Sequence, residues 1–354
     1  MNHLKQISAR LKDFGLDAML VNSDPGEFYA VGLRGEGMAV VTPDAARYIT
    51  DSRYIEVARE TVTGAEVLMV DGGRNYTALV NEFLAANNIK KLGIEDGYMS
   101  LAQYTAFTKS IEAGLIPAND LIVGLRAAKD ADELARMEKA QEITDRAFTE
   151  ICKFIQPGVT EQEIAAKLMY DMMRFGAEKM SFDPIVASGA NGSRPHAVPS
   201  EKKVRKGEFI TMDFGCKYMG YCSDMTRTLA LGEPTDDMKK VYAIVLKAQR
   251  TGIAASRAGV PGKEIHAAAA QVIQDAGYGR FFGHGYGHSV GIEIHENPNA
   301  NTRDTTPVPV GAMVSAEPGI YIPGQFGVRI EDVVRMEEGG CTDITHSPKE
   351  LIVL

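Results

Sequence analysis

The chain has 354 residues, 45% of them hydrophobic and 24% charged, which is the composition of a globular protein rather than a disordered or fibrous one. Its net charge of -9 repels phosphate backbones and argues against nucleic acid as a partner. Four cysteines are too few for a disulfide scaffold, the N-terminus lacks the apolar core of a signal peptide, and no run of about 18 apolar residues occurs. We therefore expect a cytoplasmic protein without a membrane span, and this length favours two domains.

Short strands and helices are predicted to alternate in the first third of the chain. A helix is predicted over residues 2–15, ended by Gly15, and the apolar run DAMLVNS then predicts a strand that leads into a turn at residues 24–26. Further elements are expected as strands at 38–42, 46–50 and 91–94 and as helices at 55–61 and 75–87. The pattern indicates a small α/β domain.

A long helix is predicted to open the rest of the chain. Residues 130–155 carry apolar side chains every three to four positions without Gly or Pro, and they follow a domain boundary near residues 123–129. Glycine-rich loops and strand-like runs then alternate with helices expected at 161–175, 235–258 and 263–277. We expect domains at residues 1–125 and 126–354.

Two aspartates flank a predicted hairpin. The runs EFITMD (208–213) and YCSDMTRTLAL (221–231) predict paired strands, and a fold centred between Tyr218 and Met219 would set Asp213 opposite Asp224. Like charges at facing positions destabilise a strand pair unless something neutralises them, and a divalent cation would do so.

The cysteines of this hairpin have no predicted chemical role. The same fold would place Cys216 near Tyr221 rather than opposite Cys222. Both thiols are therefore interpreted as small packing residues.

The same construction recurs near the C-terminus. Folding SAEPGIYIPGQFGVRIEDVV about Gly324 sets Glu317 opposite Glu331, and Arg329 lies on the strand face of Glu331 because side chains alternate with period two. Either pair alone is equally well explained as acids on a solvated face. Two pairs in apolar surroundings instead indicate carboxylates that a metal ion neutralises, since a buried unpaired carboxylate is costly.

Three of the seven histidines lie between the hairpins, in GHGYGHSVGIEIHE (283–296). The glycines disfavour a helix, and an extended backbone would project His284 and His288 to the same side. His196 lies in the loop GANGSRPHAVPS, where a histidine without a role is the simpler interpretation, although loops commonly carry function. The remaining histidines are predicted to be structural or surface residues: His3, His266 and His346.

One imidazole with four carboxylates suits Mn²⁺, Co²⁺, Fe²⁺ or Zn²⁺, and bridging carboxylates hold two such ions about 3.5–4 Å apart. The residues therefore predict a dinuclear hydrolase.

Five motifs carry a resemblance to a known family: ITMDFG, SDMTRT, GHGYGHSVG, SAEPGIY and VRIED, in this order. They resemble metallopeptidase family M24, with the creatinase and methionine aminopeptidase ("pita-bread") fold, in particular its Xaa-Pro dipeptidases (prolidases) and Xaa-Pro aminopeptidases. The resemblance covers essentially the whole chain. It implies an α+β fold in which a smaller α/β creatinase-type domain precedes a pita-bread catalytic domain. Methionine aminopeptidases usually lack that first domain, and creatinases share the fold without the metal ligands.

Position by position, the resemblance implies five ligands of two divalent ions, Mn²⁺ or Co²⁺ first and Zn²⁺ or Fe²⁺ as alternatives: Asp213, Asp224, His288, Glu317 and Glu331. Asp224 and Glu331 would bridge the ions, and the bridging hydroxide would attack the scissile carbonyl. Glu317 resembles the family's proton shuttle, and Arg329 resembles the arginine that positions the ligating carboxylates. Three outer histidines are implied to bind substrate and stabilise the oxyanion: His196, His284 and His295.

The implied activity is hydrolysis of the Xaa-Pro bond in dipeptides or short peptides by a homodimer. The ligands serve dipeptidases and aminopeptidases alike, and the compact length leans toward the dipeptidase. Two alternatives remain: a dinuclear aminopeptidase or hydrolase without proline specificity, and a non-catalytic scaffold of the same fold. The scaffold is disfavoured because such family members have typically lost ligands that this chain retains.

Overall fold

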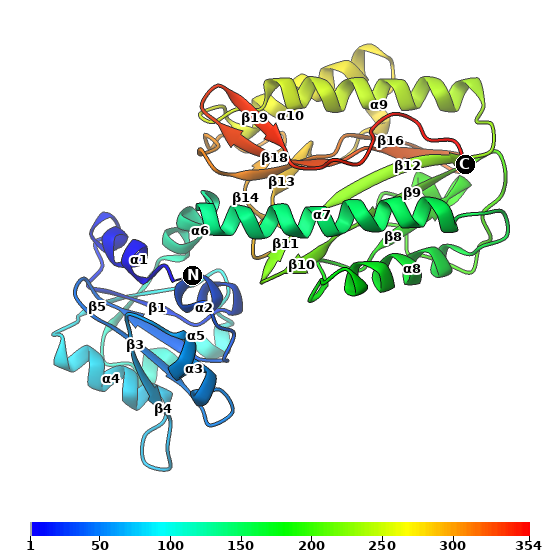
Figure 1. The fold of residues 1–354 in the computed structure, drawn as a ribbon. Coiled ribbons are helices and arrows are strands. Elements are labelled where there is room, and N and C mark those ends of the chain that lie inside the picture. Colours follow the sequence, from blue (N-terminus) through cyan, green and yellow to red (C-terminus); the bar gives the residue numbers. More distant parts are fainter. Residues whose placement is uncertain (1) are drawn as a thin grey trace. The chain divides into compact units, whose positions relative to one another are not determined.

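The computed structural model describes residues 2–354, and the chain divides into two compact units, one ending at Arg126 and the other spanning Ala127–Leu354 (Figure 1). Each unit has its own sheets and its own apolar core. No helix among the described residues is both long and apolar enough to cross a bilayer.

The first unit is built on a mixed sheet with strand order β4-β3-β2-β1-β5-β6. Its strands are β1 Ala18–Val21, β2 Met38–Val41, β3 Ala46–Thr50, β4 Glu66–Met69, β5 Lys91–Ile94 and β6 Gly114–Pro117. Its helices are α1 Leu4–Arg10, α2 Asp24–Val31, α3 Ile55–Thr61, α4 Tyr76–Ala86, α5 Leu101–Ser110 and α6 Asn119–Ala127. Helices α4 and α5 pack Phe83 and Phe107 against Leu20 and Ile94 of the sheet. The predicted α/β domain is confirmed.

Residues 24–26 begin a helix, so the predicted turn is wrong. The Ser23 hydroxyl accepts a hydrogen bond from the Gly26 amide at 3.0 Å and caps α2. Pro25 occupies the first turn of this helix, where its missing amide proton leaves no hydrogen bond unmade. Asp-Pro-Gly thus fits a capped helix start as well as a turn.

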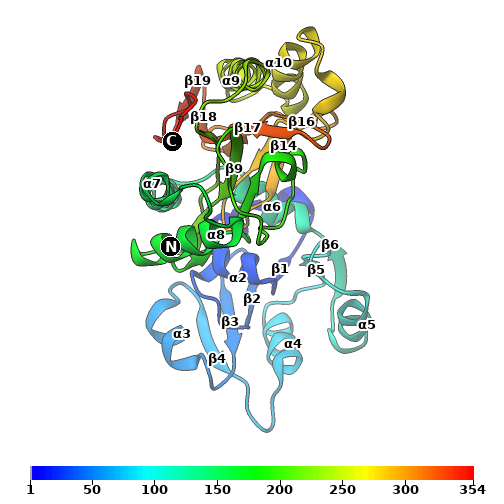
Figure 2. The same cartoon turned by 90° about the vertical axis from the view of Figure 1, so that its right-hand side faces the viewer.

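The second unit places helices on two sides of its strands (Figure 2). Helices α7 (Ala131–Phe154) and α8 (Glu161–Arg174) pack against the sheet β12-β9-β8, and α9 (Asp236–Ala255) and α10 (Gly262–Asp275) pack on the other side. The strands carrying the site are β8 Ile185–Ser188, β9 Glu208–Phe214, β12 Met225–Leu231, β13 Gly287–Ser289, β15 Met313–Ala316, β16 Gly319–Ile322, β17 Phe326–Arg329 and β18 Asp332–Glu337. The remaining strands are β7 Lys179–Met180, β10 Cys216–Tyr218, β11 Tyr221–Cys222, β14 Glu296–Ala300 and β19 Gly340–Asp343. All four predicted helices of this part are confirmed.

The first hairpin has a register two residues away from the prediction. Thr226, not Asp224, lies opposite Asp213, and the turn residues are Met219 and Gly220. A two-residue hairpin turn favours positive φ at both central positions, and the observed φ values are 45° and 83°. Glycine adopts this conformation readily, whereas the predicted centre would have put Tyr218 there. A shift of two residues keeps both aspartates on one face of the hairpin.

The new register also corrects the neighbour of Cys216. Ser223 lies across from it: the Ser223 amide donates to the Cys216 carbonyl at 2.8 Å, and the Cys216 amide donates to the Ser223 hydroxyl at 2.9 Å. Cys216 and Cys222 are both buried and free of disulfides, which agrees with their interpretation as packing residues.

The second hairpin has the predicted register. Gly319 pairs with Arg329 across the turn at Gly324, and beyond a short break the same register continues with Ala316 opposite Asp332. Glu317 and Glu331 lie within this break, at positions that correspond in the register of both flanking strand pairs. The predicted register is confirmed for the strand pairs on the two sides of the break.

Candidate active site

A cavity of about 650 Å³ in the second unit collects every residue that the sequence assigned to the site. Its walls come from both hairpins, the glycine-rich histidine segment and the loop of His196. The predicted site residues lining it are Asp213, Asp224, His288, Glu317, Glu331, His196, His284, His295 and Arg329. Four sequence segments that are far apart therefore meet at one place.

Asp224, His288 and Glu331 form the centre of this cluster. One ligand atom from each lies within 4.8 Å of the others. The His288 Nε2 atom is 3.7 Å from Asp224 Oδ2 and 3.2 Å from Glu317 Oε1. Glu317 thus extends the cluster, and the Ser315 hydroxyl donates to Glu317 Oε1 at 3.0 Å.

Asp213 joins the cluster through Arg329. The Arg329 Nη2 atom lies 2.6 Å from Asp213 Oδ2, and Nε donates to the Thr226 hydroxyl at 3.0 Å. Thr226 in turn donates to Glu331 Oε2 at 2.7 Å. One buried guanidinium therefore orients two carboxylates, directly and through a threonine.

Three carboxylate oxygens of the cluster fit a cation. Asp213 Oδ1, Asp224 Oδ1 and Glu331 Oε1 are buried and have no hydrogen-bond partner among the described residues. Leaving a buried carboxylate oxygen unpaired is costly, and coordination to a metal removes that cost. Carboxylates with one imidazole are ligands that divalent transition metals accept. The residues present therefore fit a metal site.

The charged groups of the site shift one another's pKa values. Burial, with the neighbouring carboxylates, raises the pKa of both Asp224 and Glu331 well above the ordinary range. Burial alone would also raise the pKa of Glu317, but the hydrogen bond and charge of His288, with His284 and Arg329, lower it to about 2. Glu317 is thus an anion at neutral pH, while the other two carboxylates need a positive neighbour to ionise.

Comparison with known proteins decides the family. The sequence model of metallopeptidase family M24 matches residues 135–338, and that of the creatinase/prolidase N-terminal domain matches residues 3–128. The chain belongs to metallopeptidase family M24. It is therefore a metallopeptidase with a creatinase-type N-terminal domain and a pita-bread catalytic domain, as the resemblance implied.

Named relatives cover nearly the whole M24 chain. The "Uncharacterized peptidase YqhT" of Bacillus subtilis is 40% identical, and the "Xaa-Pro dipeptidase" of Pyrococcus furiosus is 35% identical, each match covering 99% of both chains. The solved structure of an Xaa-Pro dipeptidase from Bacillus anthracis superposes with a TM-score of 0.96 at 40% identity and 99% coverage of both chains. That of an X-Pro aminopeptidase from Thermotoga maritima gives 0.91 at 36% identity, with 98% of this chain and 100% of that chain covered.

A tyrosine that the sequence analysis did not select completes the site of this M24 domain. The Tyr321 hydroxyl accepts a hydrogen bond from Arg329 Nη1 at 2.8 Å and lies 3.0 Å from His284 Nε2. His284 Nδ1 is 2.8 Å from the Gly285 carbonyl, which can only accept, so Nδ1 carries the proton and Tyr321 donates to Nε2. Both ring nitrogens of His284 are thereby occupied. The predicted hairpin contained a signal for Tyr321. This residue lies on the arm opposite Arg329, two positions after Gly319, which pairs with Arg329.

Removing the hydroxyl in Tyr321→Phe is expected to lower kcat/KM about tenfold to a hundredfold, the usual effect of losing a group that orients site residues. Arg329 and His284 would each lose a partner. The measurement is steady-state hydrolysis of a peptide that the wild-type cleaves. Tyr242→Phe is the matched control, because its buried hydroxyl donates to the Lys349 carbonyl outside the cavity and should affect only stability. Wild-type kcat/KM in Tyr321→Phe would contradict this role.

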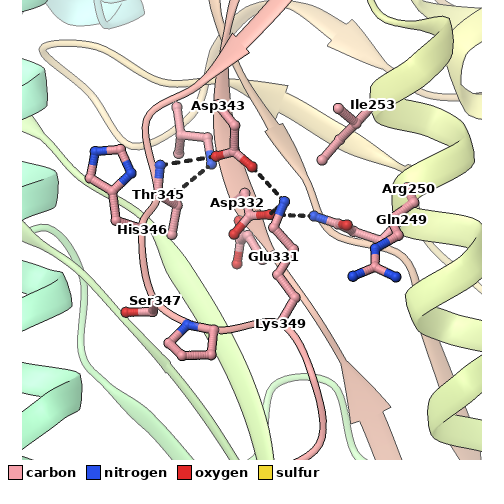
Figure 3. Close-up of polar contacts among 12 residues, drawn as sticks. Gln249, Arg250, Ile253, Glu331, Asp332, Asp343, Thr345, His346, Ser347 and Lys349 are labelled. Atoms are coloured by element: carbon pink, nitrogen blue, oxygen red, sulfur yellow. Dashed lines mark hydrogen bonds and ion pairs between the residues drawn. The ribbon is translucent and has the colours of Figure 1, made fainter.

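Asp332, which follows Glu331, belongs to a charge network with Lys349, Asp343 and Gln249 (Figure 3). Asp332 is fully buried and lies 2.7 Å from Arg227 Nη2 and 2.5 Å from Lys349 Nζ. Arg227 also donates to the carbonyl of Glu331 at 2.5 Å and to that of Thr226 at 2.9 Å. Arg227 thus fixes the backbone of Glu331 and of Thr226, the threonine that orients the Glu331 side chain.

Proposed function

We propose that this M24 peptidase hydrolyses Xaa-Pro bonds in dipeptides or short peptides with the help of two divalent metal ions. The observation that carries the proposal is the set of buried, unpaired oxygens on Asp213, Asp224 and Glu331 beside His288, in a cavity open enough for a short peptide. The names of the relatives in Pyrococcus furiosus and Bacillus anthracis support the specificity for proline.

The residues proposed to hold the ions are Asp213, Asp224, His288, Glu317 and Glu331. When bound, such a pair of ions lowers the pKa of a water molecule and polarises the substrate carbonyl. The mixture of carboxylates and imidazole favours Mn²⁺ or Co²⁺, with Zn²⁺ or Fe²⁺ as alternatives.

The roles of the other site residues are assigned from the contacts and the exposure of their side chains. Glu317, which lines the cavity beside His288, is proposed to accept the proton of the attacking water and to pass it to the leaving nitrogen. His196 and His295 are exposed in the cavity, so their ring nitrogens can reach the substrate and stabilise the oxyanion. His284, held by Tyr321, is proposed to act by fixing the cavity wall.

One wall of the cavity is apolar and suits a proline ring. The apolar residues among the cavity lining include Phe182, Pro184, Ile294, Val198 and Pro199, and Val198 is 83% exposed. Covering such side chains with a pyrrolidine ring removes apolar surface from water, which favours binding.

A peptide panel tests the proposal. Hydrolysis of Xaa-Pro, Xaa-Ala and Xaa-Pro-Yaa is measured with Mn²⁺, Co²⁺ and Zn²⁺, and proline in the second position is expected to raise kcat/KM about tenfold or more over alanine. Cleavage of dipeptides only would identify a dipeptidase, and cleavage of the longer peptides an aminopeptidase. Equal rates for proline and alanine would favour the hydrolase without proline specificity, and metal binding without any hydrolysis would favour the scaffold.

A further inference from the structure

One buried carboxylate outside the cavity fastens both ends of the loop that carries His196. Glu161, the first residue of α8, is 0% exposed. Its Oε1 accepts hydrogen bonds from the amide and hydroxyl of Ser188 at 2.7 and 2.8 Å. Its Oε2 accepts from the amide and hydroxyl of Ser200 at 3.2 and 2.6 Å. Asn191 Nδ2 lies 3.1 Å from both oxygens.

The segment between these two anchors forms part of the cavity wall. It starts with a short 3₁₀ turn, Gly189–Ser193, and then runs without regular structure through the residues that line the cavity: Pro195, His196, Ala197, Val198 and Pro199. Two further hydrogen bonds among the described residues tie its middle to the second hairpin. Arg329 Nη1 donates to the Pro195 carbonyl at 3.2 Å, and the Gly324 amide donates to the Ser193 hydroxyl at 3.3 Å.

The contacts require a carboxylate rather than an amide. Every hydrogen bond to the Glu161 carboxylate is donated by its neighbour, and the NH₂ group of a glutamine would face the backbone amide of Ser188 or of Ser200, which can only donate. Hydrogen bonds to an ionised group are also stronger than neutral ones, and a negative charge is favoured at the first turn of a helix. Glu161 itself does not line the cavity, so it can act on a substrate only through the loop.

We propose that Glu161 is a positioning residue that fixes the loop of His196 relative to the metal ligands and thereby sets the affinity for the peptide. The inference rests on the proposed function, because it concerns the same cavity. Glu161→Gln should raise KM about tenfold, since the donors of the loop lose their acceptor. Its bound metal should stay within about twofold of the wild-type value, since Glu161 lies outside the cavity and touches none of the proposed ligands. Its kcat should fall as well, because His196 on the same loop is proposed to stabilise the oxyanion.

Asp171→Asn is the matched control. Asp171 lies on the same helix, is also 0% exposed, and pairs with Lys167 instead of the loop. A loss of stability common to both variants, with KM raised only in Glu161→Gln, separates positioning from a general weakening of α8.

The experiment uses the full chain loaded with Mn²⁺ and has two readouts. Amide hydrogen exchange of residues 189–199 should be faster in Glu161→Gln than in the wild type or in Asp171→Asn, and KM is measured on a peptide that the wild type cleaves. If Glu161→Gln does not fold, Ser200→Ala, which removes one donor to Oε2, should shift both readouts in the same direction.

Unchanged exchange and unchanged KM would overturn the proposal, as would equal changes in Asp171→Asn. The exchange measurement needs no substrate, so it still tests the loop if the protein cleaves no Xaa-Pro peptide. In that case the proposed function fails, and the hydrogen-exchange rates alone decide whether Glu161 holds the loop.

Discussion

Replacing Glu331 by glutamine is expected to abolish peptide hydrolysis while the fold remains. The Thr226 hydroxyl would bind the amide oxygen, so the amide nitrogen, a donor, would replace the unpaired Oε1. Loss of a bound metal ion removes several kcal/mol of transition-state stabilisation, so kcat/KM should fall about 10³-fold or more. Asp224→Asn should behave alike, because Asp224 Oδ1 is also buried and unpaired.

The measurements are kcat/KM, metal content and the circular dichroism spectrum of each variant. Glu338→Gln is the control: it removes an exposed carboxylate just after β18 and should leave kcat/KM within about twofold, because it lies outside the cavity. Full activity in Glu331→Gln or Asp224→Asn without bound metal would refute the assignment of these ligands.

Replacing Arg227 by methionine is expected to destabilise the second unit by about 3–5 kcal/mol, the range for breaking a buried ion pair. Arg227 is 1% exposed and donates to Asp332 and to the carbonyls of Ser347 and Pro348 in the C-terminal segment. Methionine fills part of the volume but leaves the Asp332 charge with one cation fewer.

Chemical denaturation measures the free energy of unfolding of this variant. The control is Arg250→Met, because Arg250 pairs with Glu350 at the surface, with side-chain exposures of 56% and 69%, and exposed pairs contribute about 0–1 kcal/mol. A loss below about 1 kcal/mol in Arg227→Met would mean that water or Lys349 compensates the Asp332 charge.

The convergence of the proposed ligands could be predicted from sequence because turn chemistry determines where strands meet. Gly324 is the centre of a hairpin whose arms have the predicted register, and both Glu317 and Glu331 line the cavity. In the first hairpin the glycine stands second in a two-residue turn, after Met219, and the predicted centre was one residue too early. The error moved facing residues by two positions and therefore preserved the face on which Asp213 and Asp224 lie.

The supporting residues could not be predicted, because they are ordinary in their local context. Thr226 and Tyr321 have the β-propensity of strand residues, and Glu161 matches the acidic first turn of any helix. Their roles depend on partners far away in sequence: Arg329 for Thr226, and Ser188 and Ser200 for Glu161. No pattern within a single segment contains that information.

The break in the second hairpin links the formation of the site to the folding of the second unit. Within the break the Glu317 amide donates to the carbonyl of Tyr286 at 2.8 Å, and the Glu331 amide donates to that of Thr226 at 3.0 Å. These bonds join segments that are distant along the chain, and contacts of such long range form late and slow folding. The residues proposed to hold the ions come from both hairpins and from the segment of His288, so the proposed metal site is complete only when these segments have packed together.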